Sequence, residues 1–409
     1  MRILFVSHYF PPEVNAPANR THEHARRWVA DGHDVTVITC VPNHPRGQIL
    51  AGYRNRLLQS ETIDGIRVLR PWTYVTPNEG FLKRTLNYVA FAAGAVLASL
   101  RVERPDVVVA TSPQFFAGIA GAVIAAFKRR PFVLEVRDLW PDSIVQLGQL
   151  RNRRLIRLLE GIEGALYRRA AGIVVNTRSF VAHLTARGIP RGRIEIIYNG
   201  IDASLFSPRP ADHALLAEHG LEGRYLVAYI GTLGLAHGLM TVVEAAERLR
   251  GEPNVTFLLI GDGADRARLE AEAQRRGLGN VRFLGLRPRA EIPRWIASAD
   301  LLLVMLRNLP VFETVIPSKI FEYLAQERPV VVAARGEIRH LVEETKSAFV
   351  IDPEDAPALA GAVAEIRGEP AEAAARARAG RAWVDAEFQR DELARRMATF
   401  LERVVRGAS

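Results

Sequence analysis

Cysteine is almost absent from this 409-residue sequence, which contains only Cys40. A single cysteine excludes an internal disulfide and a metal site built from several thiolates. We expect Cys40 to be a small buried residue at the end of a strand. The sequence also lacks H-E-x-x-H, G-x-S-x-G and a D-x-D pair placed after a strand. These absences disfavour metal-dependent and serine-nucleophile chemistry, so we expect no metal.

Apolar runs long enough to cross a bilayer are also lacking. The two longest candidates are residues 86–100 and 115–127, and fifteen helical residues span only about 22 Å of a hydrocarbon core of roughly 30 Å. No apolar stretch with a small-residue cleavage site follows Met1. We therefore expect both runs to be buried helices, and we expect the protein to be cytoplasmic.

Acidic residues are scarce in the first half of the chain. Residues 1–206 carry 27 Lys and Arg against 16 Asp and Glu, a net charge of +11, and the remainder has a net charge of −2. A basic half beside a nearly neutral half indicates contact with something anionic: nucleic acid, a membrane surface or a phosphorylated substrate. An Arg-rich solvated surface would account for part of the same charge.

Short apolar runs alternate with amphipathic helical segments in both halves. ILFVSHY, VTVIT, PDVVVAT and PFVLEVRD are typical of parallel strands buried on both faces, and YLVAYI and VTFLLI begin the same rhythm again. This order predicts two Rossmann-like α/β domains that face one another. We place them at residues 1–206 and 207–389, with a terminal helix at about 390–409.

Ligands of parallel sheets bind at the carboxyl ends of the strands, so the loops there supply the candidate residues. GTLGLAHG begins with Gly231 and Thr232, and its backbone amides are suited to phosphate, although a tight structural turn fits the same sequence equally well. In VIPSKIFEYL, Lys319 and Glu322 lie on one side of a helix. They form either an anion and diol site or an ordinary surface pair.

In the first half, Asp138 follows a buried strand, where it is either a ligand-facing carboxylate or a helix N-cap. The proline-rich loop after the first strand leads into a helix at Arg20. We expect His8, at the end of that strand, to be a hydrogen-bonded core histidine.

Several segments in the correct order resemble the retaining GT-B glycosyltransferases of family four. YFPPEVNAPANRTHEHARRWVADGHDVTVIT is similar to the family's amino-terminal loop, helix and strand, and IEIIYNGIDASLFSP to its inter-domain segment. The block from GDGADRARLEAEA to PRWIASAD resembles its nucleotide domain. RDLWPDS and VIPSKIFEYLA are similar to a bacterial subgroup that adds sugars, L-N-acetylfucosamine among them, to undecaprenyl-pyrophosphate-linked glycans of surface polysaccharides.

The resemblance implies a GT-B fold with a C-terminal helix that crosses back to the first domain. It implies transfer of a sugar, with retention and without a metal or other cofactor, from a nucleotide sugar bound by the second domain. We expect a UDP-linked donor, although the sequence leaves guanine open as the base. The acceptor would be lipid-linked and bound by the first domain. The basic first half would attach the protein peripherally to the anionic inner face of the cytoplasmic membrane.

Residue by residue, the resemblance assigns Glu322 to the donor ribose and Ser318 and Lys319 to its diphosphate. Gly231 and Thr232 begin the loop on the phosphate side, and Asp138 would orient the transferred sugar or ease positive charge at its anomeric carbon.

Three departures from the family pattern concern the substrate loops. Thr314 occupies the position of the first of two paired glutamates. His237 replaces a usual lysine, so the diphosphate clamp depends on a protonated His237 or on Lys319. Asn15 and Ala16 stand where many members have two glycines, which makes a close backbone approach to donor or acceptor less certain, with Arg20 just beyond.

Two other functions fit parts of the pattern. A nucleotide-sugar 2-epimerase or hydrolase on the same fold would need acid and base side chains in the site. A basic nucleic-acid-binding protein would need aromatic residues interleaved with arginine on an exposed strand face. The aromatic residues here lie mostly on apolar faces, and we expect no nucleic-acid partner.

Overall fold

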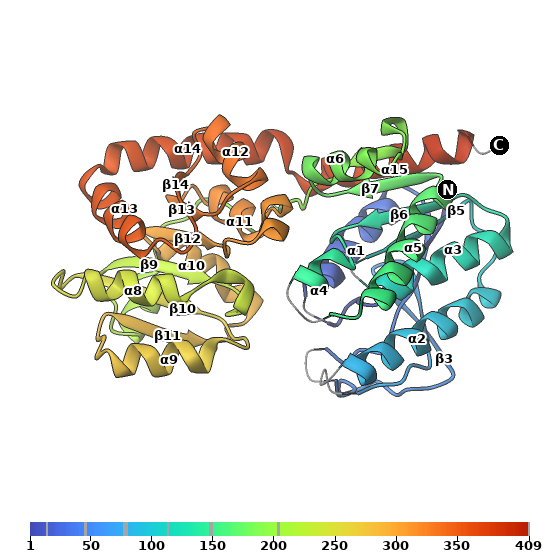
Figure 1. The fold of residues 1–409 in the computed structure, drawn as a ribbon, viewed down its shortest axis with the longest axis horizontal. Coiled ribbons are helices and arrows are strands. Elements are labelled where there is room, and N and C mark those ends of the chain that lie inside the picture. Colours follow the sequence, from blue (N-terminus) through green and yellow to red (C-terminus); the bar gives the residue numbers. More distant parts are fainter. Residues whose placement is uncertain are drawn as a thin grey trace. The chain divides into compact units, whose positions relative to one another are not determined.

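The computed structural model describes residues 1–13, 15–44, 47–76, 81–112, 114–146, 150–202 and 205–407. The chain divides into two compact units, each built on its own sheet (Figure 1). The first unit joins Met1–Asn199 to Arg390–Ser409, and the second is Gly200–Gln389. The predicted boundary at 206 falls inside the second unit. The Ile201 amide donates to the Phe388 carbonyl at 2.8 Å, so this part of the linker already belongs there.

The described residues of the first unit form an eight-stranded sheet in the order β3-β4-β2-β1-β5-β6-β7-β8. All neighbouring strands are parallel except β3 and β4, which form an antiparallel hairpin. In chain order the strands are β1 (Arg2–Val6), β2 (Asp34–Ile38), β3 (Leu58–Ile63), β4 (Ile66–Pro71), β5 (Val107–Thr111), β6 (Phe132–Val136), β7 (Gly172–Val175) and β8 (Ile194–Ile196).

Helices cover both faces of this sheet. Those with side chains in the main core are α2 (Phe81–Ala98), α3 (Phe115–Lys128), α5 (Arg153–Arg169) and α6 (Arg178–Ala186). The other face carries α1 (Ala16–Ala30) and α15 (Arg390–Gly407). The remaining short elements are η1 (Ser99–Arg101), α4 (Asp142–Gln146) and η2 (Arg191–Arg193). Buried valine, isoleucine and leucine on both sides of the strands account for this layered arrangement.

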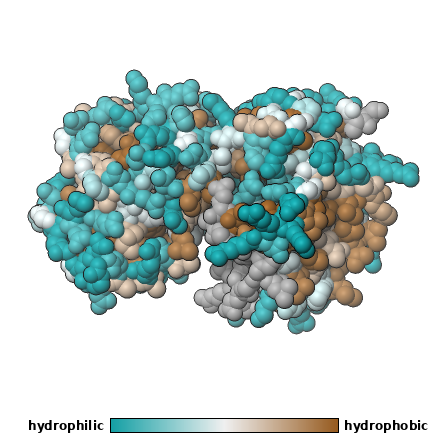
Figure 2. All heavy atoms as spheres, viewed as in Figure 1, coloured by the Kyte–Doolittle hydropathy of each residue, from teal (hydrophilic) through white to brown (hydrophobic). Residues whose placement is uncertain are grey.

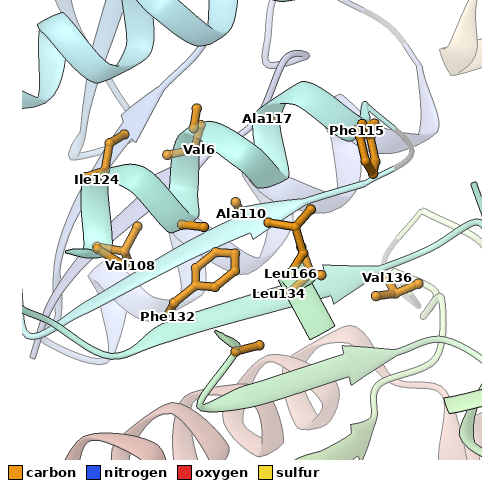
Figure 3. Close-up of a cluster of buried hydrophobic side chains, with 14 of the residues drawn as sticks. Val6, Val108, Ala110, Phe115, Ala117, Ile124, Phe132, Leu134, Val136 and Leu166 are labelled. Carbon is orange, nitrogen blue, oxygen red and sulfur yellow. The ribbon is translucent and has the colours of Figure 1, made fainter. Parts of the chain in front are cut away.

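The centre of the first core lies where α3 crosses β5 and β6 (Figure 3). Phe132 and Leu134 of β6 pack beneath the helix together with Ala110 of β5. A Cβ on Gly121 would lie 2.4 Å from the Ala110 Cβ, so the small residues of α3 allow this close approach. The same parity places Val136 on the α3 face and Glu135 on the α1 face, because side chains alternate along a strand.

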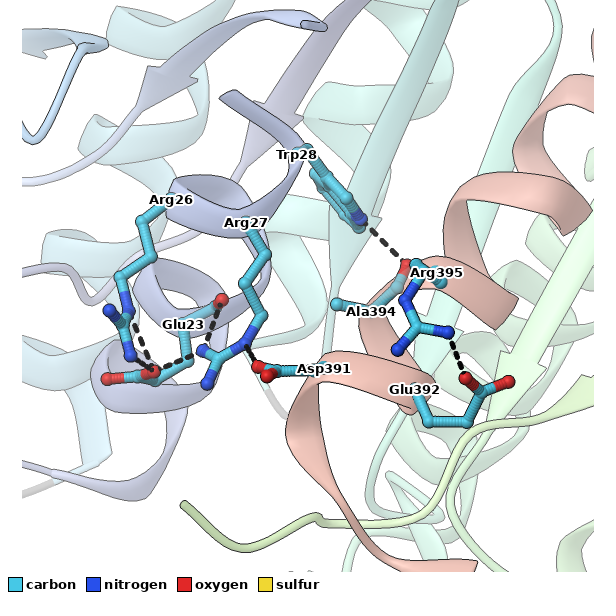
Figure 4. Close-up of polar contacts among 8 residues, drawn as sticks. All are labelled: Glu23, Arg26, Arg27, Trp28, Asp391, Glu392, Ala394 and Arg395. Carbon is cyan, nitrogen blue, oxygen red and sulfur yellow. Dashed lines mark hydrogen bonds and ion pairs between the residues drawn. The ribbon is translucent and has the colours of Figure 1, made fainter. Parts of the chain in front are cut away.

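The terminal helix α15 packs on α1 (Figure 4). The Trp28 indole donates to the Ala394 carbonyl at 3.0 Å, and Arg27 pairs with Asp391. A Cβ on Gly172 would lie 2.7 Å from Phe400, so β7 and α15 are also in close contact. The expected return of the last helix to the first domain is therefore confirmed.

The described residues of the second unit form a six-stranded parallel sheet in the order β11-β10-β9-β12-β13-β14. Its strands are β9 (Tyr225–Ile230), β10 (Val255–Ile260), β11 (Val281–Gly285), β12 (Leu301–Met305), β13 (Val330–Ala333) and β14 (Phe349–Ile351). Its helices are α7 (His213–Glu218), η3 (Leu235–His237), α8 (Met240–Arg248), α9 (Arg266–Arg275), η4 (Arg289–Glu291), α10 (Ile292–Ser298), η5 (Pro310–Thr314), α11 (Lys319–Ala325), α12 (Glu337–Glu344), α13 (Ala356–Gly368) and α14 (Pro370–Glu387).

The two long apolar runs form helices, as expected, but the helices are buried on one side only. Their inner sides enter the core, but α2, η1 and α3 expose large apolar side chains. These side chains are Leu86, Val89, Leu97, Leu100, Val123 and Phe127. No helix within the described ranges is long and apolar enough to span a bilayer.

Candidate functional site

The loops after β9 and β10 are joined by backbone contacts. The Gly231 amide donates to the Ile260 carbonyl at 2.8 Å, and the Leu233 amide donates to the Asp262 carbonyl at 2.9 Å. A Cβ on Gly261, whose φ is 141°, would lie 1.9 Å from the Gly231 carbonyl oxygen, so only glycine fits. The amides of Gly231 and Leu233 are therefore engaged within the protein, as in the alternative of a tight structural turn, and a phosphate would have to use other amides of this loop.

Lys319 supplies the cation of this loop cluster. Its Nζ is buried, has no hydrogen-bond partner among the described residues, and lies 3.5 Å from the centre of the Tyr229 ring. A Cβ on Gly231 would lie 2.8 Å from the same Nζ, so the ammonium borders the loop directly. A buried ammonium without hydrogen bonds does not fit the alternative of an ordinary surface pair with Glu322.

Tyr323 fixes the helix that carries Lys319. Its hydroxyl donates to the Ile230 carbonyl at 3.0 Å and lies 3.1 Å from the Ile230 amide, which donates to it. One turn separates Tyr323 from Lys319, so α11 is held against the carboxyl end of β9. Tyr229 and Tyr323 therefore position the lysine. The sequence did not single them out, because tyrosines in an apolar strand and an apolar helix face have the pattern of ordinary core residues.

The electrostatics of the cluster separate Lys319 from His237. Burial lowers the pKa of Lys319 to about 7, against a smaller opposing effect of Glu322. Burial, followed by the charge of Lys319, lowers the pKa of His237 to about 4. The His237 Nδ1 lies 3.2 Å from the Met305 carbonyl, so Nδ1–H donates and Nε2 has no proton to offer. Of the two cations considered for the diphosphate, a protonated His237 is therefore disfavoured and Lys319 is left.

The other predicted residues of the second unit differ in exposure and in hydrogen bonding. Thr232 is exposed, and its carbonyl accepts from Tyr229 at 2.8 Å. Ser318 precedes α11 without a side-chain capping bond, and Glu322 is half-buried on the first turn. The Thr314 hydroxyl donates to the Val311 carbonyl at 3.0 Å, so it is already engaged within η5.

In the first unit, Asp138 lines a small pocket beside β6. The pocket has a volume of about 20 Å³ and is also lined by Trp140, Tyr167 and Ser112. Trp140 packs on Phe115 with ring centres 4.3 Å apart, which closes one side. This volume suits about one water molecule and is too small for a sugar.

The predicted loop residues Asn15, Ala16 and Arg20 mainly build α1. Asn15 caps the helix, which begins at Ala16, by accepting from the Ala18 amide at 2.9 Å. Arg20 is buried and donates to Glu135 at 2.7 Å. It also donates to the carbonyls of Tyr198 and Ile197. Its guanidinium is thus engaged inside the unit, which argues against the expected contact with donor or acceptor.

Two polar features of the first unit were missed or misjudged from the sequence. The first is Arg137, which directly follows β6. The charged residue Glu135 within the otherwise apolar strand is the signal that could have indicated a polar site near Arg137. The buried Nδ1 of His8 has no hydrogen-bond partner among the described residues, so the expectation of a fully hydrogen-bonded His8 is wrong.

Comparison with known proteins identifies the class. Residues 15–200 match the family model described as "Glycosyl transferase 4-like domain", and residues 224–368 match "Glycosyl transferases group 1". Together the two matches span more than half of the chain, which therefore belongs to the glycosyltransferases. The two-unit α/β architecture is the GT-B fold, as expected.

Individual relatives agree with this assignment. The putative colanic acid biosynthesis glycosyl transferase WcaI of Escherichia coli is 28% identical over 374 residues, covering 89% of this chain and 91% of that protein. The 2-deoxystreptamine glucosyltransferase of Streptomyces kanamyceticus is 28% identical over 67% of this chain and 71% of that protein.

Solved structures share the fold. HepE of Anabaena, crystallised with UDP-glucose, has a TM-score of 0.73 at 22% identity, covering 98% of this chain and 100% of that chain. The sucrose-phosphate synthase of Thermosynechococcus elongatus has a TM-score of 0.77 at 20% identity, with both chains fully covered.

Proposed function

We propose that this glycosyltransferase transfers a sugar from a UDP-linked donor to an undecaprenyl-pyrophosphate-linked acceptor in surface-polysaccharide synthesis, with retention of configuration. The resemblance of RDLWPDS and VIPSKIFEYLA to the corresponding subgroup supports the acceptor class and an N-acetylated sugar such as L-N-acetylfucosamine. WcaI carries colanic acid biosynthesis in its name, and HepE was crystallised with UDP-glucose, which supports the pathway type and the base.

The observation that carries the proposal is the buried ammonium of Lys319 at the carboxyl end of β9. Parallel sheets bind nucleotides at this edge, and a buried cation without a hydrogen-bond partner is suited to an anionic ligand. A nucleoside diphosphate would supply the oxygens that Lys319 lacks. Glu322, one turn along α11, would accept hydrogen bonds from the ribose.

The proposed reaction is a front-side displacement. The acceptor oxygen attacks the anomeric carbon from the face that the diphosphate leaves, and the bond between that carbon and the phosphate oxygen breaks. The electron pair goes to the leaving phosphate, which takes the acceptor's proton. Lys319 stabilises the charge that develops there, so the proposal includes no metal. Asp138 enters it as a group that orients the transferred sugar, which requires the pocket that it lines to open beyond its present volume of about 20 Å³.

The first prediction tests the donor site by nucleotide binding. UDP should bind more tightly than GDP or TDP and raise the melting temperature, since a ligand stabilises the state it binds. Lys319→Met should weaken UDP binding at least about tenfold, because a charge-assisted contact is worth about 1.5 to 3 kcal/mol. Isothermal titration measures both, and Lys346→Met is the matched control because Lys346 is exposed in the same unit.

Two results would contradict this prediction. Equal UDP affinity in Lys319→Met and the unaltered protein would remove Lys319 from the site. Conversion of a nucleotide sugar to an epimer or a free sugar, in the absence of acceptor and at the rate of turnover, would favour the epimerase or hydrolase instead.

We also propose that the first unit docks on an anionic membrane through an apolar face formed by α2, η1 and α3. Figure 2 shows hydrophobic residues gathered over α2 and α3. The exposed fraction is 67% for Leu97 and 65% for Phe127, and exposed Lys83, Arg101 and Arg129 belong to the same helices and their ends. Apolar insertion flanked by basic residues suits anionic lipid, which would bring the enzyme to a lipid-linked acceptor.

A further inference from the structure

Polar residues follow four neighbouring parallel strands of the first sheet. Ser112 comes directly after β5, Arg137 after β6, and Asn176 after β7, while Asn199 lies three residues beyond β8. Arg137 links three of these strands, because its guanidinium donates to the Asn199 Oδ1 at 3.0 Å and its amide donates to the Ser112 Oγ at 3.2 Å. They therefore meet at the carboxyl ends of these strands, where parallel sheets bind ligands.

Arg137 and the candidate Asp138 lie on opposite sides of this edge. Leu134, Val136 and Asp138 line the small pocket on the α3 face. Glu135 pairs with Arg20 of α1, on the other face of the sheet. Arg137 is two residues further along the chain, so its side chain is on the same face as that of Glu135. The Asp138 carboxylate therefore does not neutralise the Arg137 guanidinium.

The charges around Arg137 do not balance. The Glu135 carboxylate accepts from Arg20 at 2.7 Å, and no carboxylate of the described ranges lies within ion-pair distance of Arg137. Burial, followed by the charge of Arg20, lowers the pKa of Arg137 to about 9. His24 is neutral and adds no further charge, since burial and the surrounding arginines keep its pKa well below its usual range. Two guanidinium groups thus share one carboxylate, which leaves an excess positive charge.

We propose that this edge is an oxyanion subsite, centred on Arg137, that binds a phosphate group of a substrate. Arginine pairs with phosphate through a planar set of donors, and Asn199, which accepts from the guanidinium through Oδ1, places its amide group beside it. The Asn176 Oδ1 is buried without a partner among the described residues; as an acceptor it would take a hydrogen bond from a water or from a hydroxyl of the ligand, and not from a phosphate oxygen. The subsite belongs to the first unit, so it is additional to the Lys319 site.

Two phosphates of the proposed reaction have the required chemistry: the diphosphate of the nucleotide sugar and the pyrophosphate of the acceptor. The choice between these two phosphates rests on the proposed function. The geometry itself calls only for an anion, and inorganic pyrophosphate therefore serves as the probe.

The test measures pyrophosphate binding to the full chain in a Lys319→Met background, where the second unit's site is weakened. Addition of Arg137→Gln should lower the affinity at least about tenfold, the scale of a charged hydrogen bond. Addition of Arg137→Lys, which keeps the charge but not the planar donor set, should lower it less. Arg104→Gln is the matched control, because Arg104 is exposed and without an ion pair in the described structure.

Melting temperatures provide a second readout, because a purely structural role of Arg137 predicts the opposite change in stability. Without anion, Arg137→Gln should be at least as stable as its parent, because the substitution removes an uncompensated, half-buried charge. Pyrophosphate should raise the melting temperature of the parent and not that of Arg137→Gln. A structural Arg137 would instead make Arg137→Gln less stable and would leave Arg137→Lys no better a binder than Arg137→Gln, which overturns the proposal.

Titration with UDP distinguishes the source of the phosphate. Loss of UDP affinity in Arg137→Gln, in an otherwise unaltered chain, assigns the subsite to the donor. Unchanged UDP affinity with weakened pyrophosphate binding assigns it to the acceptor. Unchanged pyrophosphate affinity in both Arg137 variants overturns the subsite. If Lys319→Met leaves UDP binding unchanged, the donor site fails, but the effect of Arg137 on pyrophosphate still decides the subsite.

Discussion

At the residue scale, the low pKa of Lys319 should couple nucleotide binding to proton uptake. The ammonium is half-deprotonated near pH 7 in the free protein, and a bound diphosphate favours its charged form. Above pH 7 each nucleotide bound should therefore take up a proton. UDP affinity should fall by up to about tenfold per pH unit between pH 7 and 9.

Isothermal titration in buffers of different ionisation enthalpy measures this proton uptake. Neighbouring groups do not titrate in the same window, since the pKa of His237 is about 4 and that of Tyr229 is well above its usual value. Lys319→Met should abolish the pH dependence above pH 7. A slope that persists in this variant would assign the proton to another group.

Lys319 also has a defined effect on stability against pH. Its folded pKa lies below its unfolded pKa, so the unfolded chain binds more protons between about pH 7 and pH 10. The cost of burying the ammonium is therefore complete below pH 7 and diminishes as the pH rises.

The sequence predicted the arrangement of Lys319 and Glu322 on α11 better than the electrostatics around them. Residue spacing sufficed to place Lys319 and Glu322 on one side of a helix. One charge state and one ion pair were out of reach. The neutral state of His237 depends on burial and on Lys319, which only the packed loops provide. Arg20 was expected near a substrate, but its partner Glu135 lies 115 residues away in the chain.

At the scale of elements, the contact of α15 with β7 should hold the first unit together. Phe400 is buried and lies where a Cβ on Gly172 would stand, so the helix rests directly on the strand. Phe400→Ala should therefore lower the free energy of unfolding of this unit by about 3 to 5 kcal/mol, the range for a truncated core phenylalanine.

Hydrogen exchange read by mass spectrometry can locate that loss. Amides of α1, β7 and α15 should exchange faster in Phe400→Ala, whereas β9, β10 and β12 should keep their protection. Arg406→Ala is the control on the same helix, since its side chain is 79% exposed, and it should change little. Equal loss of protection in both units would show that the two sheets do not unfold separately.

Element prediction succeeded for the buried parallel strands, whose apolar runs have few other interpretations. It missed the β3–β4 hairpin, because LQSETI has apolar residues only at its two ends and is nowhere fully buried. The sequence did contain a local signal, because Asp64-Gly65 is a dipeptide typical of a two-residue hairpin turn. In the structure both residues have positive φ, 49° and 78°, in the turn between these strands. The outer sides of α2 and α3 were misjudged because composition reports apolar content but not the direction in which side chains point.

At the scale of the whole molecule, the uneven charge along the chain combines with the apolar face of α2, η1 and α3. Each basic residue near an anionic surface contributes about 1 kcal/mol, and each large apolar side chain that leaves water contributes about 1.5 kcal/mol or more. The protein should therefore float with vesicles that contain anionic lipid and not with purely zwitterionic ones. Binding should be lost at about 1 M salt, where the Debye length is about 3 Å.

The contribution of the apolar face can be isolated with paired substitutions. Leu97→Gln combined with Phe127→Gln should weaken vesicle binding at least about tenfold, because the change removes two side chains that would enter the interface. Leu286→Gln is the control, since Leu286 is 78% exposed in the second unit and lies outside the proposed face. Activity on a water-soluble acceptor analogue should be unaffected in both variants. If the double variant floats as well as the unaltered protein, the attachment is purely electrostatic and the apolar face must be assigned another partner.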